Sequence, residues 1–249
     1  MDPISLLIVF IAGIIGSSFG TLVGGTSLIT IPLFIFLGLP PHTAIGTDRL
    51  GISGLTIAGW YQFHKKGLID YKIGLLMGLF GLIGSFLGAN LVLKIEVTLL
   101  KKVIAMITFF ILIILVLKPG IGIEGKRSVL TTRQYSTGLF FNFLVGIYCG
   151  FYGAMAGTFM LYVLLFSFKQ TFLEGTATVK ICSLMMTTTA AIVFASKGSI
   201  DYTVAAVMFV GCAIGSYFGA QYAERIGNVW IRRLFITIVL AMVVNLLFV

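Results

Sequence analysis

The chain has 249 residues, of which 59% are hydrophobic and only 10% are charged, and its mean hydropathy is +1.10. These values lie far outside the range of soluble domains and indicate an all-α polytopic membrane protein. The net charge of +9 comes from lysines and arginines in short loops, which in a membrane protein bear on orientation and on anionic lipid. Nucleic acid is therefore excluded as a partner, and the lipid bilayer is expected.

Apolar stretches that are long enough to cross a bilayer recur along the chain. A hydrocarbon core about 30 Å thick needs roughly 20 apolar residues per helix. Such stretches lie at residues 4–23, 43–62, 73–93, 137–153, 176–195 and 202–222. The first lacks the basic start and the small-residue cleavage site of a secretory signal, so we expect it to be the first membrane helix.

Two further apolar segments, residues 27–39 and 157–168, are too short to cross a membrane. At 1.5 Å per residue, such a helix reaches only about 20 Å. Both begin at a Gly-Thr step and are expected to be half-helices or re-entrant segments, because broken backbone is tolerated only inside the protein. The steps are Gly25-Thr26 and Gly157-Thr158. The sequence therefore predicts about eight to ten membrane segments, two of them short or broken.

The chain contains an internal repeat at an offset of 131 residues. KGLIDY at 66–71 returns as KGSIDY at 197–202, and IGSFLGA at 83–89 returns as IGSYFGA at 214–220. The aspartates of the repeated IDY are expected to cap the helices that follow them. The repeat divides the chain into two homologous halves.

The division predicts a first membrane repeat at residues 1–117, a polar linker at 118–135 and a second membrane repeat at 136–249. If each half crosses four times, the repeats are parallel and the loop lysines and arginines divide 8 to 7 between the two sides. If each half crosses five times, the repeats are inverted and the division is 11 to 4. The positive-inside rule favours the uneven division. Inverted repeats with both termini outside are therefore favoured over parallel ones.

The repeat pairs Thr47 with Thr178 and Arg49 with Lys180, so each half places one cation within an apolar stretch. A charge at the bilayer centre costs on the order of 2.5 to 3.5 kcal/mol on insertion scales. We therefore expect both cations to converge on one small anion at the interface of the repeats, where transporters commonly bind substrate. The two threonine hydroxyls would add hydrogen bonds to it.

An acidic residue lies near each cation in the sequence: Asp48 beside Arg49, and Glu174 shortly before Lys180. In the alternative interpretation these acids neutralise the cations and both pairs are structural, or the cations reach an interface from a helix end. The same two carboxylates are candidates for proton coupling, since anion uptake against a negative interior needs a co-transported proton or sodium ion.

The starts of the two short segments supply the remaining predicted substrate ligands. Gly25, Thr26, Gly157 and Thr158 can present backbone N–H groups and the positive end of a short helix to an oxyanion. For the glycines alone, close packing of helices is the alternative.

The cysteines and histidines form no recognised chemical motif. Cys149, Cys182 and Cys212 lie in apolar stretches without CxxC spacing and are interpreted as packing residues, with a thiol-dependent sulfur relay as the alternative. His42 and His64 stand apart, so neither a metal site nor a cofactor is predicted. No catalytic constellation is present, so the chain is not expected to be an enzyme. A membrane scaffold without a substrate is a further alternative.

The arrangement of these motifs resembles the TauE/SafE sulfite exporter family of membrane permeases. The resemblance spans essentially the whole chain and rests on GGTSLITIPLFIFLGLPPHTAIGT, the T-x-(K/R) step, K-G-x-I-D-Y and G-S-x-x-G-A. It implies a permease of the prokaryotic cell membrane that moves small sulfur-containing anions such as sulfite or organosulfonates. With the paired cations, it favours alternating access around a mid-membrane site.

This chain departs from the family's common T-N-K pattern, because it has Thr47, Asp48 and Arg49 at these positions. Arginine keeps the cation and adds a planar donor fork suited to an oxyanion. Aspartate places an acid directly beside it.

Overall fold

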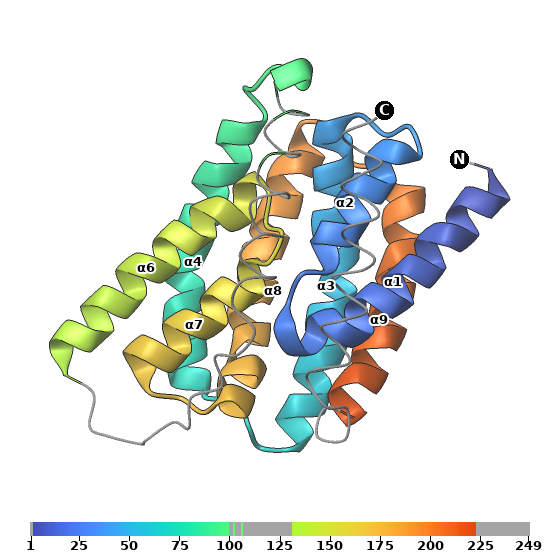
Figure 1. Cartoon of the computed structure of the whole chain (residues 1–249). Coiled ribbons are helices and arrows are strands. Elements are labelled where there is room, and N and C mark those ends of the chain that lie inside the picture. Colours follow the sequence, from blue (N-terminus) through green and yellow to red (C-terminus); the bar gives the residue numbers. More distant parts are fainter. Residues whose placement is uncertain (1, 100–101, 103–105, 107–130, 223–249) are drawn as a thin grey trace.

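The computed structural model describes residues 2–99, 102, 106 and 131–222, and this part of the chain is helical, without strands (Figure 1). The helices are α1 (Pro3–Val23), α2 (Thr26–Phe36), α3 (Pro41–Lys65), α4 (Tyr71–Val92), α6 (Thr132–Phe151), α7 (Ala156–Phe168), α8 (Phe172–Ser196) and α9 (Tyr202–Tyr222). The predicted all-α class is confirmed. Most of the predicted linker and the C-terminal part of each predicted repeat lie outside the described residues.

Polar side chains fix the starts of several helices. Asp70 accepts a 3.0 Å hydrogen bond from the backbone N–H of Ile73, and Asp201 accepts one of the same length from Val204. The capping role predicted for the two IDY aspartates is therefore confirmed.

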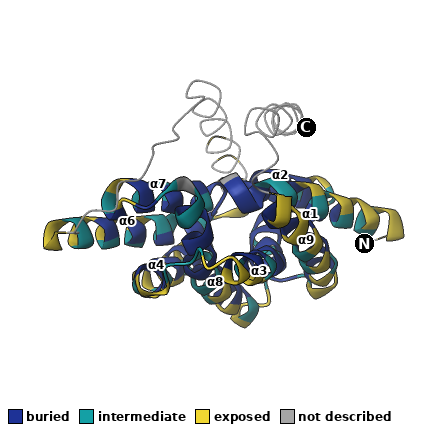
Figure 2. Cartoon of the chain, turned by 90° about the horizontal axis from the view of Figure 1, so that it is seen from below, coloured by how far each residue is buried: buried dark blue, intermediate teal, exposed yellow. Residues whose placement is uncertain are grey.

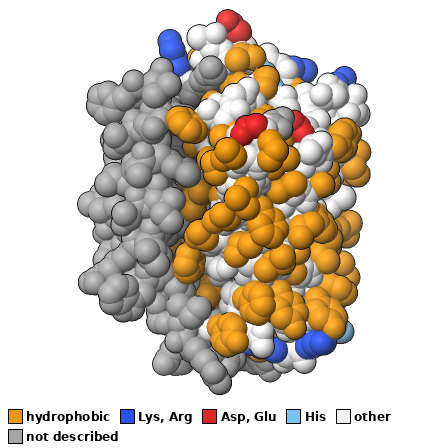
Figure 3. All heavy atoms as spheres, turned by 90° about the vertical axis from the view of Figure 1, so that its right-hand side faces the viewer, with side chains coloured by type: hydrophobic (Ala, Val, Ile, Leu, Met, Phe, Trp, Pro, Cys, Tyr) orange, Lys and Arg blue, Asp and Glu red, His pale blue; other side chains and the backbone are white. Residues whose placement is uncertain are grey.

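Four of the described helices contain segments long and apolar enough to cross a membrane. These segments are Pro3–Leu22, Tyr71–Val92, Leu173–Ser196 and Tyr202–Tyr222. Figure 3 shows a broad band of hydrophobic side chains on one face of the molecule, with charged side chains gathered toward the two ends. Large exposed side chains such as Ile4, Phe86 and Ile192 are typical of a surface that lies in lipid rather than in water.

The two short helices are α2, with 11 residues, and α7, with 13, so the predicted short segments are confirmed. Each follows a short non-helical turn, which we call a helix break. Gly24 and Gly25 before α2, and Gly153 and Met155 before α7, have positive φ angles, which no helix can continue through.

The helices form two layers, as Figure 2 shows: α1, α2, α6 and α7 lie in one, and α3, α4, α8 and α9 in the other. In the second layer, α9 packs on α3 and also contacts α1, while α4 packs on α8 and also contacts α6. The central pair α3 and α8 runs in opposite directions (Figure 1). Gly46 near the start of α3 meets Phe194 near the end of α8, and Gly59 meets Lys180 near the start of α8.

Residues at the offset of 131 make matching hydrogen bonds between the halves. The hydroxyl of Ser85 on α4 donates to the carbonyl of Met186 on α8 at 2.7 Å, and that of Ser216 on α9 donates to the carbonyl of Leu55 on α3 at 2.8 Å. These bonds attach α4 and α9 to the central pair at equivalent positions.

Candidate functional site

The breaks before α2 and α7 touch each other between the halves. A Cβ atom added to Gly24, whose φ is +80°, would lie 2.9 Å from the backbone nitrogen of Thr158, so a larger residue does not fit. A Cβ atom on Gly157 would lie 3.6 Å from the Cα of Gly24. Because α2 begins at Thr26 and α7 at Ala156, the positive ends of both helices lie near this contact, and neither helix has a side-chain cap at its start.

Arg49 is buried at the side of this junction and contacts both halves. Its Nη2 atom donates to the hydroxyl of Ser27 at 2.8 Å and to the carbonyl of Tyr152 at 3.3 Å. The same atom pairs with the carboxylate of Asp48, and Nη1 lies 3.8 Å from the sulfur of Cys149. Arg49 therefore joins the start of α2 to the end of α6.

Asp48 is fully buried and is held by donors from two helices. Its carboxylate accepts a 2.8 Å hydrogen bond from Ser27 and a further one from Thr30, both on α2, in addition to the pair with Arg49. Local neutralisation of Arg49, which the alternative interpretation expects, is thus what the structure shows. Thr30 is a partner of Asp48 that was not predicted from the sequence, although Ser27 and Thr30 stand three residues apart on one face of a helix.

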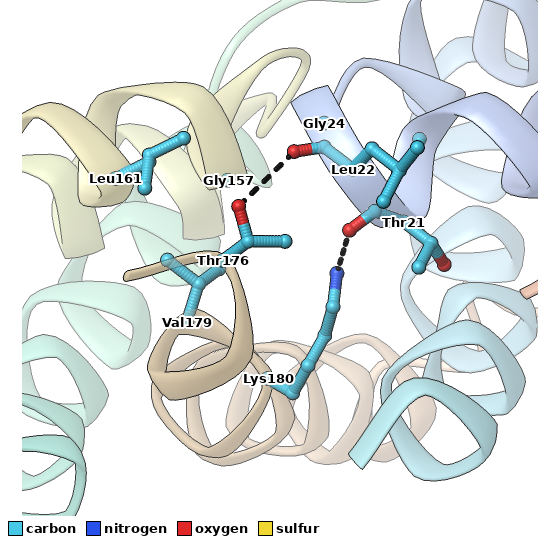
Figure 4. Close-up of a pocket in the computed structure, with 9 residues that line it drawn as sticks. Thr21, Leu22, Gly24, Gly157, Leu161, Thr176, Val179 and Lys180 are labelled. Atoms are coloured by element: carbon cyan, nitrogen blue, oxygen red, sulfur yellow. Dashed lines mark hydrogen bonds between the residues drawn. The ribbon is translucent and has the colours of Figure 1, made fainter. Parts of the chain in front are cut away.

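Lys180 has a different environment. It is 3% exposed, and its Nζ atom donates to the carbonyl of Thr21 at 2.6 Å. Among the residues that the structure describes, it forms no ion pair. Its side chain borders a cavity of about 20 Å³ between α1, α7 and α8 (Figure 4). Gly24, Gly157, Thr176 and Val179 also line this cavity.

Glu174 lies in the first turn of α8, six residues before Lys180. Its carboxylate accepts hydrogen bonds from the backbone N–H of Thr171 at 3.1 Å and from the hydroxyl of Thr171 at 3.0 Å, in a capping box. Six residues correspond to about 9 Å along a helix. The structure thus gives this acid a capping role at the start of the helix.

The two cations make matching contacts, because each donates to a carbonyl of the other half. Arg49 reaches Tyr152 and Lys180 reaches Thr21, and the two carbonyls are themselves 131 residues apart. Gly59, which faces Lys180, stands ten residues beyond Arg49 on α3, about 15 Å along the helix. The structure therefore places the cations in two separate half-sites. The first half-site consists of Arg49 with Asp48, Ser27 and the carbonyl of Tyr152. The second consists of Lys180 with the carbonyl of Thr21 and the adjoining cavity.

The predicted threonine and glycine ligands divide between these half-sites and the scaffold. Thr47 accepts from the backbone N–H of Asp201 at 2.9 Å, and Thr178 accepts from that of Asp70 at 3.2 Å. These hydroxyls thus attach α9 to α3 and α4 to α8. Thr26 donates to the carbonyl of Gly16 at 3.1 Å, and Gly25 is the residue before α2.

The other predicted groups lie apart from the cavity lining. Cys149, Cys182 and Cys212 are buried and free. His42 contacts the carbonyl of Val92 at 3.0 Å, and His64 contacts the hydroxyl of Tyr71 at 2.6 Å. No cluster of potential metal ligands occurs within the described ranges.

Comparison with known proteins places this sequence in a family. The model of the family described as sulfite exporter TauE/SafE matches residues 7–246. The chain belongs to the sulfite exporter TauE/SafE family. The family predicted from the sequence motifs is thus confirmed.

Several bacterial proteins named as probable membrane transporters are similar to this member of the TauE/SafE family. One from Bacillus subtilis is 27% identical over 229 residues, which cover 91% of this chain and 92% of that protein. One from Sinorhizobium is 29% identical over 245 residues, covering 97% and 92%. One from Escherichia coli strain K12 is 26% identical over 257 residues, covering 100% and 91%. No solved structure shows significant similarity. The chain is a multi-pass membrane transporter and not an enzyme.

Proposed function

We propose that this transporter moves small oxyanions, such as sulfite or organosulfonates, by alternating access around the cavity beside Lys180. The observation that carries the proposal is a buried lysine that has no ion-pair partner among the described residues and borders a cavity where two helix breaks meet. Figure 4 shows its side chain extending from α8 toward the end of α1. Transporter sites commonly lie at such broken helices.

The electrostatic argument favours an anion as the substrate. A charge inside a membrane costs on the order of 2.5 to 3.5 kcal/mol on insertion scales. For Arg49 the carboxylate of Asp48 offsets this cost, whereas within the described part of the chain the partner of the Lys180 ammonium group is the uncharged carbonyl of Thr21. A bound anion would complete the neutralisation, and the start of α7 beside the cavity would present its positive end to it.

The size of the cavity supports a conformational cycle. A volume of about 20 Å³ accommodates roughly one water molecule, so an oxyanion with several heavy atoms needs the two breaks to move apart. The opposite directions of α3 and α8 support two inverted halves, which alternating access uses as two elements that rock against each other. In the described conformation the cavity would then be too small to hold the substrate.

Membrane voltage gives the transport a preferred direction. Moving one negative charge out of a negative interior is favourable by about 2.3 kcal/mol per 100 mV. Export as a uniport therefore needs no coupling ion, whereas uptake needs a co-transported proton or sodium ion. For proton coupling, the buried Asp48 is the stronger candidate, because Glu174 caps the start of α8.

The thiol-dependent alternative receives no support from the cysteines. Cys149 is 1% exposed and Cys182 and Cys212 are 0% exposed, whereas a sulfur relay needs an accessible thiolate. A triple Cys→Ala variant that retained full flux would dismiss that function.

The deciding experiment is flux of labelled sulfite and methanesulfonate through proteoliposomes. We expect Lys180→Gln to lose most of the flux while remaining monodisperse, because the cation at the cavity is gone. Lys72→Gln, at an exposed lysine, is the matched control and should transport normally. Unchanged flux in Lys180→Gln would place the substrate elsewhere and overturn the proposal.

A further inference from the structure

The two half-sites differ at one equivalent position. The offset of 131 residues that pairs Arg49 with Lys180 also pairs Asp48 with Val179. In the first half-site, the carboxylate of Asp48 accepts hydrogen bonds beside its cation. In the second, Val179 lines a cavity beside the cation. The first half-site therefore contains an anion that belongs to the chain, and the second contains space instead.

The formal charges of the buried ionisable side chains in the two half-sites add up to one positive charge. Among the described residues, the buried Asp, Glu, Lys and Arg side chains are those of Asp48, Arg49 and Lys180. When all three are ionised, they carry a net charge of +1. Uncompensated charge is costly in a low-dielectric interior. One added negative charge makes this group neutral, whereas two leave it with an excess of negative charge.

We propose that the carboxylate of Asp48 acts as a tethered anion that fills the first half-site, and that the cavity beside Lys180 and Val179 binds a singly charged oxyanion in preference to a doubly charged one. A sulfonate or hydrogensulfite belongs to the preferred class, and sulfate belongs to the disfavoured one. This inference rests on the proposed function and specifies the charge of its substrate.

The Lys180–Thr21 contact leaves donors for an anion. The ammonium group of Lys180 has three N–H groups and donates one to the carbonyl of Thr21 at 2.6 Å, so an anion in the cavity can accept from the others. Because Thr21 lies on α1 and Lys180 on α8, the bound anion would lie beside a direct contact between the two halves.

The first test uses the unmodified full-length chain in proteoliposomes and compares methanesulfonate with sulfate, whose charges are fixed at one and two near neutral pH. We expect methanesulfonate flux to exceed sulfate flux by about tenfold or more, a factor that a modest difference in binding free energy produces. Equal fluxes would overturn the inference but leave the proposed function in place. Absence of flux for both anions and for sulfite would overturn the proposed function itself.

Variants then test the role of the tethered carboxylate. Asp48→Asn raises the net buried charge by one, so the preference for methanesulfonate over sulfate should fall several-fold. Asp70→Asn is the matched control, because asparagine caps a helix as well as aspartate does and this residue lies outside the half-sites. An unchanged preference in Asp48→Asn would contradict the assignment.

Val179→Asp makes the complementary change, since it places a carboxylate beside Lys180 as Asp48 stands beside Arg49. We expect this variant to lose methanesulfonate flux, and Val179→Asn, with a side chain of the same size but no charge, to lose much less. Equal losses in both would show that size rather than charge matters and would overturn the proposal. If Val179→Asp does not fold, the selectivity of the unmodified chain decides.

Discussion

The ammonium group of Lys180 on α8 donates a 2.6 Å hydrogen bond to the carbonyl oxygen of Thr21 on α1. This bond joins a buried cation of one half to the last turn of α1 in the other half. Thr21 lies close to Gly24, where α1 ends. Since the carbonyl is a neutral acceptor, it satisfies the hydrogen bond without neutralising the charge. In the proposed function, this charge binds the substrate anion.

Replacing Lys180 with methionine separates a functional role from a structural one. Replacing buried ion pairs by apolar side chains of similar volume is often neutral or stabilises the protein by about 1 to 4 kcal/mol, because the buried charges no longer have to be desolvated. The same reason applies to a single buried charge. We expect Lys180→Met to unfold at the same or a higher temperature in detergent while anion flux is lost. A lower unfolding temperature with retained flux would assign Lys180 a purely structural role.

Replacing Arg49 should lower the stability of the protein, because its ion-pair partner Asp48 remains buried. Arg49→Gln leaves the fully buried carboxylate of Asp48 without its cation, and breaking a buried pair typically costs about 3 to 5 kcal/mol. We expect a large loss of stability in chemical unfolding. The double variant Arg49→Gln, Asp48→Asn should recover part of it, and additive losses would contradict the coupling of the two side chains.

The contact between the helix breaks predicts that Gly24 cannot be replaced by a larger residue without loss of stability. Gly24→Ala adds a methyl group 2.9 Å from the nitrogen of Thr158 at a φ of +80°, so it meets both backbone strain and a steric clash. Gly38 has a φ of +95° but nothing within 4 Å of its Cβ position, so Gly38→Ala measures strain alone, roughly 1 to 2 kcal/mol. We expect Gly24→Ala to cost clearly more stability and to reduce flux. Equal effects of the two variants in unfolding and flux assays would argue against a tight junction.

The hydroxyls of Thr47 and Thr178 should contribute to stability by similar amounts. Each accepts a hydrogen bond from the backbone N–H of an IDY aspartate, Asp201 or Asp70, in the partner helix. Thr47→Val and Thr178→Val each remove one such acceptor, so we expect losses of about 1 kcal/mol in the free energy of unfolding. Both variants, when folded, should still transport the anion. Loss of flux in either variant would indicate that the replaced threonine binds the substrate.

The sequence by itself determined the features that depend on neighbouring residues. Continuous apolar stretches predict the membrane class, and the limited length of two of them predicts the short helices α2 and α7, because the rise per residue is fixed. The repeated IDY predicts the caps at Asp70 and Asp201, and the offset between repeats finds both Arg49 and Lys180.

The tertiary structure alone decided which groups meet. Nothing near Lys180 in the sequence points to the carbonyl of Thr21, and nothing near Asp48 points to Thr30, since these contacts depend on how distant segments pack. That both cations converge on one anion stays a prediction, since the structure shows their local partners, Asp48 beside Arg49 and the carbonyl of Thr21 beside Lys180, but no substrate. Hydropathy is a property of consecutive residues, whereas the partner of a buried charge is set by the three-dimensional path of the whole chain.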